Sequence, residues 1–124
     1  MDRILIVEDS AAMRAYVRAA LEADGTLEVV EAASGLDALR LLPRGPYRLV
    51  VTDINMPDLS GLELVSFIRK SQHKATPIVI ISTEGRETDR ERAIALGANA
   101  YVTKPFTPDE LMRVVAPLMA ASGI

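Results

Sequence analysis

The sequence predicts an α/β protein in which a doubly wound, five-stranded parallel sheet is covered by helices on both faces. Five short apolar runs alternate with five segments of helical periodicity, as in consecutive βα units. The runs are rich in β-branched residues and do not alternate with polar ones, which is typical of strands buried on both faces. With 124 residues, 49% of them hydrophobic, and no internal repeat, the chain is expected to form one domain over residues 1–124.

The apolar runs and the segments between them define the expected elements. We expect strands at 4–7, 27–31, 49–53, 78–81 and 100–102, and helices at about 13–21, 34–42, 61–71, 86–96 and from 108 onwards. Connections between parallel strands are right-handed, which favours the strand order 2-1-3-4-5, although the pattern by itself leaves other orders open.

Turn and cap residues bound the first two helices. Asp24 with Gly25 closes the first, whose apolar residues recur at helical spacing. Ser34, with Asp37 three positions later, starts the second, and a proline- and glycine-rich stretch stops it.

The third helix begins with a capping box made of Ser60 and Glu63. The residues expected to face the core are Leu64, Val65 and Ile68, with Phe67 beside them. The fourth helix is charged at its start, so we expect it to be the least stable element, and Gly97 ends it.

The fifth helix has a strong start signal in Thr107, Pro108 and Glu110, which supply an N-cap, a proline in the first turn and a capping acid. Its expected core face consists of Leu111, Val114, Val115, Leu118 and Met119. Pro117 lacks the N–H that would bond a preceding carbonyl, so we expect a kink or an early end there.

Composition excludes several classes of function. The chain has no cysteine, so disulfides, thiolate metal sites and a cysteine nucleophile are excluded. His73 is the only histidine and lies in a polar stretch, where we expect a solvated loop residue. A net charge of −3 argues against direct nucleic-acid binding. Without a signal peptide or a membrane-spanning run, we expect a cytoplasmic protein with no membrane insertion.

Polar residues follow four of the five strands. Asp53 ends the third strand, Glu8 and Asp9 follow the first, Ser82 follows the fourth and Lys104 the fifth. Taken alone, Asp53 has an equally good interpretation as a turn or cap residue. In a parallel sheet, however, the carboxyl ends of these strands meet at one edge, where ligands bind in open α/β folds.

Three carboxylates at one edge repel each other unless a cation joins them, and hard oxygen ligands favour Mg²⁺. Mg²⁺ usually completes its coordination with waters and a phosphate oxygen, which implies a phosphoryl group. Lys104 can neutralise phosphoryl charge, and the Ser82 hydroxyl can donate to a phosphoryl oxygen. Asp53 is then the candidate nucleophile, because aspartyl phosphate is an established covalent intermediate.

These residues carry a resemblance to a known family. The motifs are Val7-Glu8-Asp9-Ser10, Asp53-Ile54-Asn55-Met56-Pro57 with Gly61, Ser82-Thr83, and Lys104-Pro105-Phe106. Together and in this order, they resemble the receiver domain of two-component response regulators, nearest to single-domain chemotaxis regulators of the CheY type, across essentially the whole chain. The resemblance implies the flavodoxin-like strand order 2-1-3-4-5.

The resemblance also implies roles for the site residues. Asp53 would accept a phosphoryl group from a phosphohistidine of a sensor histidine kinase or phosphotransfer protein. Asp9 and Asp53 would ligate Mg²⁺, Asn55 would add its backbone carbonyl, and Glu8 would act mostly through a bound water. Lys104 would pair with the phosphoryl group.

A conformational response is implied as well. Ser82 would move toward the phosphoryl group, and Tyr101 matches the switch aromatic of the family, although by position alone it is a half-buried strand tyrosine with a wet hydroxyl. The output surface for a downstream protein target would be the fourth helix, fifth strand and fifth helix of a monomer, including Arg90. The charge run at 86–92 otherwise reads as a solvated helix face.

Two positions depart from the commonest family pattern, and one peptide bond is expected to be unusual. Glu8 stands where Asp is frequent, and Thr83 stands where Ala or Gly is usual, so Thr83 narrows access for a phosphodonor or water. Lys104-Pro105 resembles the family's cis peptide. Asn55 and Glu84 resemble the pair that orients an attacking water, which implies a short-lived phosphoryl state.

Two other functions use an aspartate in this kind of fold. Haloacid-dehalogenase-like hydrolases carry their nucleophile on the first strand with a second Asp two residues later, whereas here Asp53 follows the third strand and position 55 is Asn. A degenerate receiver that only binds partners usually lacks the aspartate or the lysine, and both are present. The sequence therefore favours a phosphoacceptor switch that assists its own phosphorylation and dephosphorylation.

Overall fold

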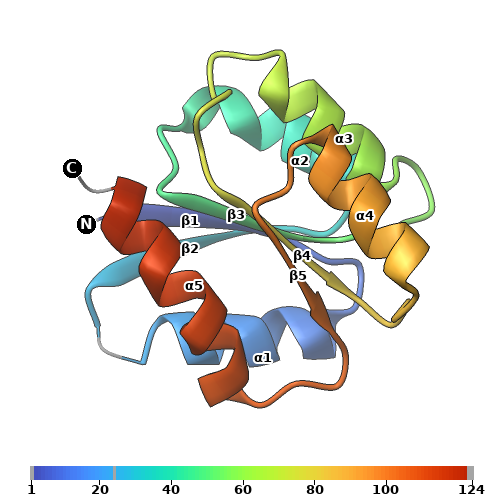
Figure 1. The fold of residues 1–124 in the computed structure, drawn as a ribbon. Coiled ribbons are helices and arrows are strands. Elements are labelled where there is room, and N and C mark those ends of the chain that lie inside the picture. Colours follow the sequence, from blue (N-terminus) through green and yellow to red (C-terminus); the bar gives the residue numbers. More distant parts are fainter. Residues whose placement is uncertain (1, 24, 123–124) are drawn as a thin grey trace.

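The computed structural model describes residues 2–23 and 25–122 (Figure 1). Its elements are β1 (Asp2–Val7), α1 (Ala11–Leu21), β2 (Leu27–Ala32), α2 (Gly35–Leu41), a 3₁₀ turn η1 (Leu42–Arg44), β3 (Leu49–Asp53), α3 (Gly61–Arg69), β4 (Ile78–Ser82), α4 (Glu87–Leu96), β5 (Ala100–Thr103) and α5 (Pro108–Ser122). All ten predicted elements are present. Asp24, expected to close the first helix, lies outside the described residues.

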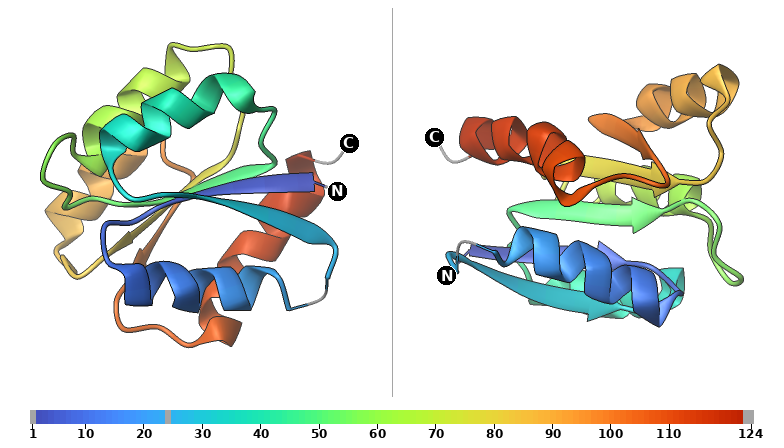
Figure 2. Two further views of the ribbon diagram at one scale, coloured as in Figure 1. Left: turned by 180° about the vertical axis from the view of Figure 1, so that it is seen from behind. Right: turned by 90° about the horizontal axis from the view of Figure 1, so that it is seen from below.

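The five strands form one parallel sheet in the order β2-β1-β3-β4-β5, so the predicted order is confirmed. Helices α1 and α5 cover one face of the sheet, and α2, α3 and α4 cover the other (Figures 1 and 2). Figure 2 also shows the twist of the sheet between these two layers. The architecture is that of a doubly wound α/β domain.

Each face of the sheet has its own hydrophobic core. Leu5 and Val7 of β1 point to the α2–α3–α4 side, whereas Ile4 and Ile6 point to the α1–α5 side. Strands β3 and β4 are buried along their whole length. This two-sided burial explains why the strands read as continuous apolar runs.

The helix caps agree with the sequence signals. Ser60 and Glu63 form the predicted reciprocal capping box, and Thr107 and Glu110 make the same pair of bonds before α5. Gly97 ends α4 at a φ of 120°, in the left-handed region that glycine adopts most easily. Helix α4 has no side-chain cap at its start, which is in line with its expected weakness.

The structure corrects the placement of Phe67, whose exposed fraction is 49%. Leu64, Val65 and Ile68 are fully buried as predicted. Phe67 precedes Ile68 by one residue, which is about 100° around a helix, and this rotation carries it off the buried stripe toward solvent.

Of the kink or early end expected at Pro117, the early end is wrong, because α5 continues to Ser122. Pro117 and Arg113, whose carbonyl loses its helical partner, are both exposed, so water can reach that carbonyl. Leu118 and Met119, beyond the proline, still pack against the core on the α1–α5 side.

His73 is buried, with an exposed fraction of 8%, so the expectation of a solvated loop residue is wrong. Its ring lies 6.0 Å from the ring of Tyr47, measured between centroids. A Cβ on Gly45 would lie 2.6 Å from the imidazole Cε1, so the absence of a side chain at Gly45 makes room for the ring. Nothing in the polar stretch around His73 indicates this distant packing.

In the part of the chain that the structure describes, no helix has the length and apolar character needed to cross a bilayer.

Candidate functional site

The site lies at the carboxyl edge of the sheet, where Asp53 is the last residue of the central strand β3. Asp53 is buried, with 6% of its surface exposed. The chain then turns into α3, and the N–H of Gly61 donates to the carbonyl of Ile54 at 2.8 Å. A Cβ on Gly61 would lie 2.1 Å from the carbonyl oxygen of Asp53, so only glycine allows α3 to begin this close to the strand end.

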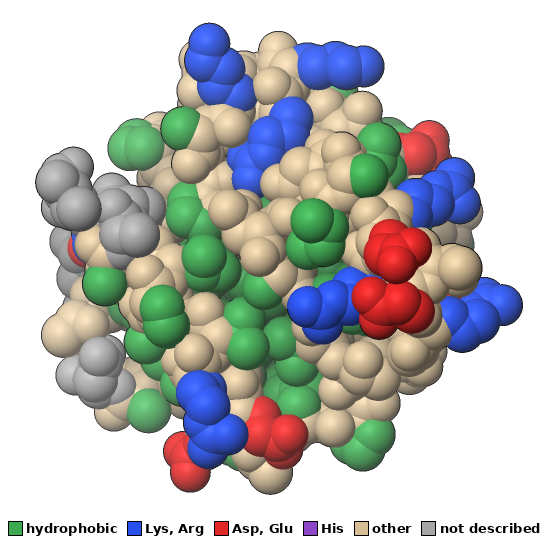
Figure 3. Space-filling model, viewed as in Figure 1, with side chains coloured by type: hydrophobic (Ala, Val, Ile, Leu, Met, Phe, Trp, Pro, Cys, Tyr) green, Lys and Arg blue, Asp and Glu red, His purple; other side chains and the backbone are tan. Residues whose placement is uncertain are grey.

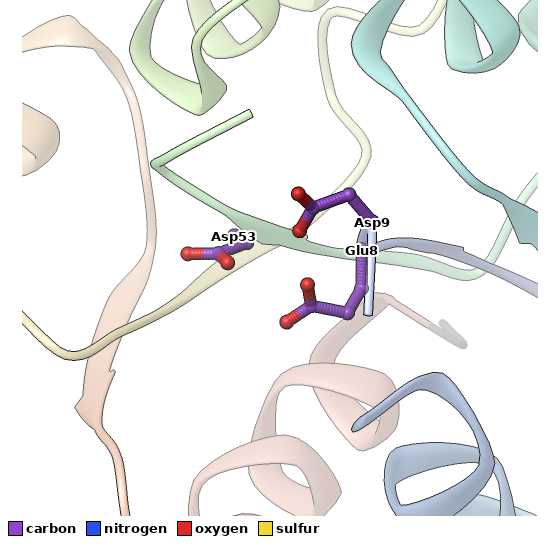
Figure 4. A group of neighbouring side chains, drawn as sticks. All are labelled: Glu8, Asp9 and Asp53. Carbon is purple, nitrogen blue, oxygen red and sulfur yellow. The ribbon is translucent and has the colours of Figure 1, made fainter. Parts of the chain in front are cut away.

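Glu8 and Asp9 follow β1, the strand next to β3. The strand register pairs Val7 with Thr52, so the residues after Val7 lie beside Asp53. One carboxylate oxygen from each of Glu8, Asp9 and Asp53 lies within 4.8 Å of the others. In Figure 4 the carboxylates of Glu8 and Asp9 extend toward the side on which Asp53 lies.

Glu8 is almost fully buried, with 1% exposed, and each of its polar groups has a partner. Its backbone N–H donates to the carbonyl of Ala32 at 3.0 Å. Its Oε2 accepts from the N–H of Ser10 at 3.0 Å, and its Oε1 accepts from Nζ of Lys104 at 2.7 Å. Glu8 is therefore held in one orientation before any metal is considered.

Lys104 follows β5 and reaches across to two carboxylates. Its Nζ donates to Oε1 of Glu8 at 2.7 Å and to Oδ2 of Asp53 at 3.1 Å. Burial by itself lowers the pKa of Lys104, but hydrogen bonds to Glu8 and Asp53 outweigh it and raise the pKa above its usual value. The side chain is therefore a permanent cation at neutral pH. The peptide bond from Lys104 to Pro105 is cis, as predicted, and so is Gly45–Pro46, which was not predicted.

Asp9 is the exposed member of the acidic cluster. Side-chain hydrogen bonding with Glu8, followed by burial and by repulsion from Glu8, raises its pKa above the usual value, while Lys104 acts in the opposite direction. Three carboxylates face one ammonium group, so the cluster carries excess negative charge that a divalent cation would neutralise.

Ser82, the last residue of β4, is fully buried, and its Oγ accepts a hydrogen bond from the N–H of Glu84 at 3.0 Å. Its carbonyl accepts from the backbone N–H of Lys104 at 2.7 Å. Tyr101 is buried, and its hydroxyl donates to the carbonyl of Glu84. The wet hydroxyl expected from position alone is therefore not found.

The remaining predicted residues follow the ends of β3 and β4. Asn55 is exposed, and its backbone N–H lies 3.4 Å from Oδ1 of Asp53, at the long limit for a hydrogen bond. Thr83 is exposed, and the Glu84 carboxylate lies 3.6 Å from Nη2 of Arg86. The structure thus joins Asp53, Glu8, Asp9 and Lys104 directly, whereas Ser82 and Tyr101 are linked to them through backbone contacts.

Sequence reasoning missed Arg14, which lies one turn into α1. Its Nη1 donates to the carbonyl of Glu8 at 2.8 Å, and its Nε donates to Oε1 of Glu31 on β2 at 3.1 Å. No local pattern reveals a pairing between residues 17 positions apart, so the sequence offered no signal for it.

The residues present fit a magnesium ion. Mg²⁺ prefers oxygen ligands and takes one or two carboxylates while keeping waters, and this cluster offers three carboxylates with one exposed toward solvent. Cysteine and histidine, which would suit softer metals, are absent from the cluster.

Comparison with known proteins identifies the family along most of the chain. The family model for the response regulator receiver domain matches residues 4–116. A chemotaxis protein CheY homolog from Campylobacter jejuni is 37% identical over 111 residues, which cover 88% of this chain and 85% of that protein.

Solved structures agree in fold. The chemotaxis response regulator CheY4 of Vibrio cholerae is 34% identical, with a TM-score of 0.87 over 95% of this chain and 98% of that one. A receiver domain of a sensor histidine kinase from Pseudomonas aeruginosa is 29% identical, with a TM-score of 0.86 over 96% and 98% of the two chains. That domain has a magnesium ion coordinated in its active site cleft. From the family match, the identity and the shared architecture, this chain belongs to the response regulator receiver domains, the CheY-like family of two-component signalling.

Proposed function

We propose that this chain is a phosphorylation-controlled signalling switch that accepts a phosphoryl group on Asp53 from a phosphohistidine of a sensor histidine kinase or phosphotransfer protein. The supporting observation is the arrangement around Asp53, whose Oδ2 lies 3.1 Å from the Lys104 ammonium and whose carboxylate shares one space with those of Glu8 and Asp9. Asp9 and Lys104 have shifted pKa values and lie where ligands bind in open α/β sheets, which makes this edge a candidate functional site.

In the proposed reaction an oxygen of Asp53 attacks the phosphorus atom of the donor. An O–P bond forms, the P–N bond to the donor imidazole breaks, and its electron pair returns to the ring nitrogen, while the imidazole takes up one proton from water and leaves neutral. The Lys104 ammonium stabilises the charge on the phosphoryl oxygens, and the Ser82 hydroxyl donates to one of them. Asp53 needs no general base, because its carboxylate is already a nucleophile.

Bound Mg²⁺ would supply the positive charge that lets a carboxylate approach an anionic phosphoryl group. Asp9 and Asp53 would hold it directly, and Asn55 would add its backbone carbonyl. Glu8 would act through a water. Both oxygens of Glu8 already accept hydrogen bonds, which supports this indirect role.

Phosphorylation would then change partner binding through the surface formed by α4, β5 and α5. Strand β5 is an edge strand, so this surface is not covered by another strand. Charged side chains of both signs mix over α4, and hydrophobic side chains gather over β5 and α5 (Figure 3). Such a mixture suits a downstream protein better than nucleic acid, because no single sign dominates.

Incubation with acetyl phosphate, read by intact mass, tests the phosphoacceptor. We expect one phosphoryl addition that requires Mg²⁺ and disappears in Asp53→Asn, because Asp53 contacts the Lys104 ammonium whereas both carboxylate oxygens of Glu8 already accept hydrogen bonds. Glu28→Gln, an exposed acid on β2, is the matched control and should label like wild type. Equal labelling of Asp53→Asn, or labelling in chelator, would refute the assignment.

Amide exchange, compared with and without phosphorylation, tests the output surface. We expect altered protection in α4 and β5, including Tyr101, and little change in β2 at the opposite edge of the sheet. Exchange that is unchanged in α4 and β5 would leave the charged residues at 86–92 as an ordinary solvated helix face.

A further inference from the structure

The carbonyl of Glu8 lies just beyond the last backbone hydrogen bond that joins β1 to β2. The last backbone bond between β1 and β2 at this end is from the N–H of Glu8 to the carbonyl of Ala32, at 3.0 Å. The carbonyl of Glu8 instead accepts from Nη1 of Arg14 at 2.8 Å. The guanidinium of Arg14 on α1 therefore holds the backbone at the point where the strand pairing ends.

The rigid guanidinium of Arg14 donates one hydrogen bond to β2 and another to the residue that follows β1. Nε of Arg14 donates to Oε1 of Glu31 at 3.1 Å while Nη1 holds the Glu8 carbonyl. The Arg14 side chain is 19% exposed and the Glu31 side chain 29%, so the pair is largely shielded from water. Because the fork is planar, fixing one donor on β2 also fixes the direction of the other.

The peptide plane that Arg14 holds is the one that leads into Asp9. A peptide unit is planar, so a fixed Glu8 carbonyl fixes the direction in which the chain enters Asp9. Asp9 is the exposed carboxylate of the acidic cluster and has more freedom than the buried Glu8. The orientation of the Asp9 carboxylate therefore depends on the peptide unit that precedes it.

We propose that Arg14 is a positioning residue for the metal site, which aims the Asp9 carboxylate by holding the Glu8 carbonyl against β2. The inference rests on the proposed Mg²⁺ role of Asp9 and extends it to a residue that touches neither metal nor phosphoryl group. Groups that orient metal ligands from outside typically change metal affinity by about 10–100-fold when removed.

Arg18 is the matched control, because it lies one turn further along α1 and pairs with the same glutamate. It contacts Glu31 and Glu22 but not the Glu8 carbonyl. Removing either arginine deletes one positive charge and one partner of Glu31. Deleting a positive charge favours cation binding, so in the alanine variants this electrostatic effect opposes the effect of a misoriented Asp9 carboxylate. Arg14→Lys keeps the positive charge but lacks the two fixed donors of the guanidinium.

Mg²⁺ titration by calorimetry of wild type, Arg14→Ala, Arg14→Lys, Arg18→Ala and Arg18→Lys tests the proposal, with urea unfolding of each variant. We expect the dissociation constant for Mg²⁺ to rise about 10-fold in both Arg14 variants and to change less than about 2-fold in both Arg18 variants, at similar losses of stability. Labelling by acetyl phosphate in Arg14→Lys should recover to the wild-type rate at saturating Mg²⁺, because the metal is bound more weakly but the chemistry is intact.

Wild-type affinity in the Arg14 variants, or equal weakening in the Arg18 variants, would overturn the role of Arg14 and leave the proposed function standing. Absence of Mg²⁺ binding by wild type would overturn both. A labelling rate in Arg14→Lys that stays low at saturating Mg²⁺ would also contradict the proposal, since aiming a metal ligand would then not be the function of Arg14.

Discussion

Substituting Gly61 by alanine introduces a methyl group into the closest backbone approach at the site. The added Cβ would lie 2.1 Å from the carbonyl oxygen of Asp53 and 2.9 Å from its carbonyl carbon. Both atoms belong to β3, which is held between β1 and β4 and cannot retreat. The start of α3 must therefore move by about 1 Å, and overpacking of this kind costs about 1–3 kcal/mol.

Two smaller effects act on the same substitution. The shift weakens the bond from the Gly61 N–H to the carbonyl of Ile54, worth about 1 kcal/mol. Alanine is the better helix former by about 1 kcal/mol, which offsets that loss. The net expectation is a loss of about 2 kcal/mol, a large share of the roughly 5–15 kcal/mol that stabilises a domain.

Urea unfolding measures this loss, and Gly85→Ala is its control. The nearest atom to a Cβ on Gly85 is Cγ2 of Thr103 at 3.5 Å, an ordinary contact, so that variant should stay within about 0.5 kcal/mol of wild type. Gly61→Ala should also label more slowly with acetyl phosphate, because the displaced atoms belong to Asp53 itself. Equal stability of the two variants would refute the argument from close approach.

Three further predictions concern charge and lifetime. Lys104→Met leaves the buried carboxylates of Glu8 and Asp53 without their ammonium partner, so its free energy of unfolding in chelator should fall by about 3 kcal/mol in urea, and Mg²⁺ should restore part of the loss. The exposed Lys74→Met is the control. A free energy of unfolding that is unchanged in Lys104→Met would contradict the role of Lys104 in balancing these two charges. The pKa of Glu31 is held below its ordinary 4.5, first by hydrogen bonding from Arg18, so its contribution to stability is present above pH 4.5 and is lost as pH falls through the lower folded-state pKa. Glu31→Gln should therefore flatten the fall in stability below about pH 5, and an identical slope would show that other carboxyls cause it. After removal of the donor, phosphorylated Asn55→Lys and Glu84→Ala should decay more slowly than wild type, because each loses a group expected to orient the attacking water. Thr83→Ala should decay faster, because the smaller side chain would open access for water. Equal decay in all of them would show that none of the three residues controls the water.

The sheet and the site edge were predictable because both follow from local sequence. Uninterrupted apolar runs marked strands buried on both faces, and parallel pairing then required Asp53, Glu8 and Lys104 to emerge at one edge. Helix starts were equally accessible, since a capping box such as Ser60 with Glu63 spans only four residues.

Features that depend on contacts between distant residues were not predictable. His73 is buried because Gly45 leaves room for its ring, and Arg14 meets Glu31 across 17 positions. Asp58, which precedes α3, accepts hydrogen bonds from the N–H groups of Gly35 and Leu36 at the start of α2. Each pairing requires the finished fold, because periodicity and cap motifs describe only neighbours in sequence.

The backbone of Lys104 links the charge at Asp53 to the proposed output surface. Its Nζ bonds the carboxylates after β1 and at the end of β3, while its N–H donates to the carbonyl of Ser82 at the end of β4. From Ser82 the contacts continue, because its Oγ accepts from the N–H of Glu84 and the Glu84 carbonyl accepts from the hydroxyl of Tyr101. Coupling requires an element with two arrangements, not only a chain of contacts. The segment from Ser82 to α4 has few anchors, since α4 lacks a side-chain cap and among its residues only Ala93 is buried. In the proposed switch, a new negative group on Asp53 would draw Lys104 and Ser82 toward it and so act on this weakly anchored segment, where Tyr101 would respond.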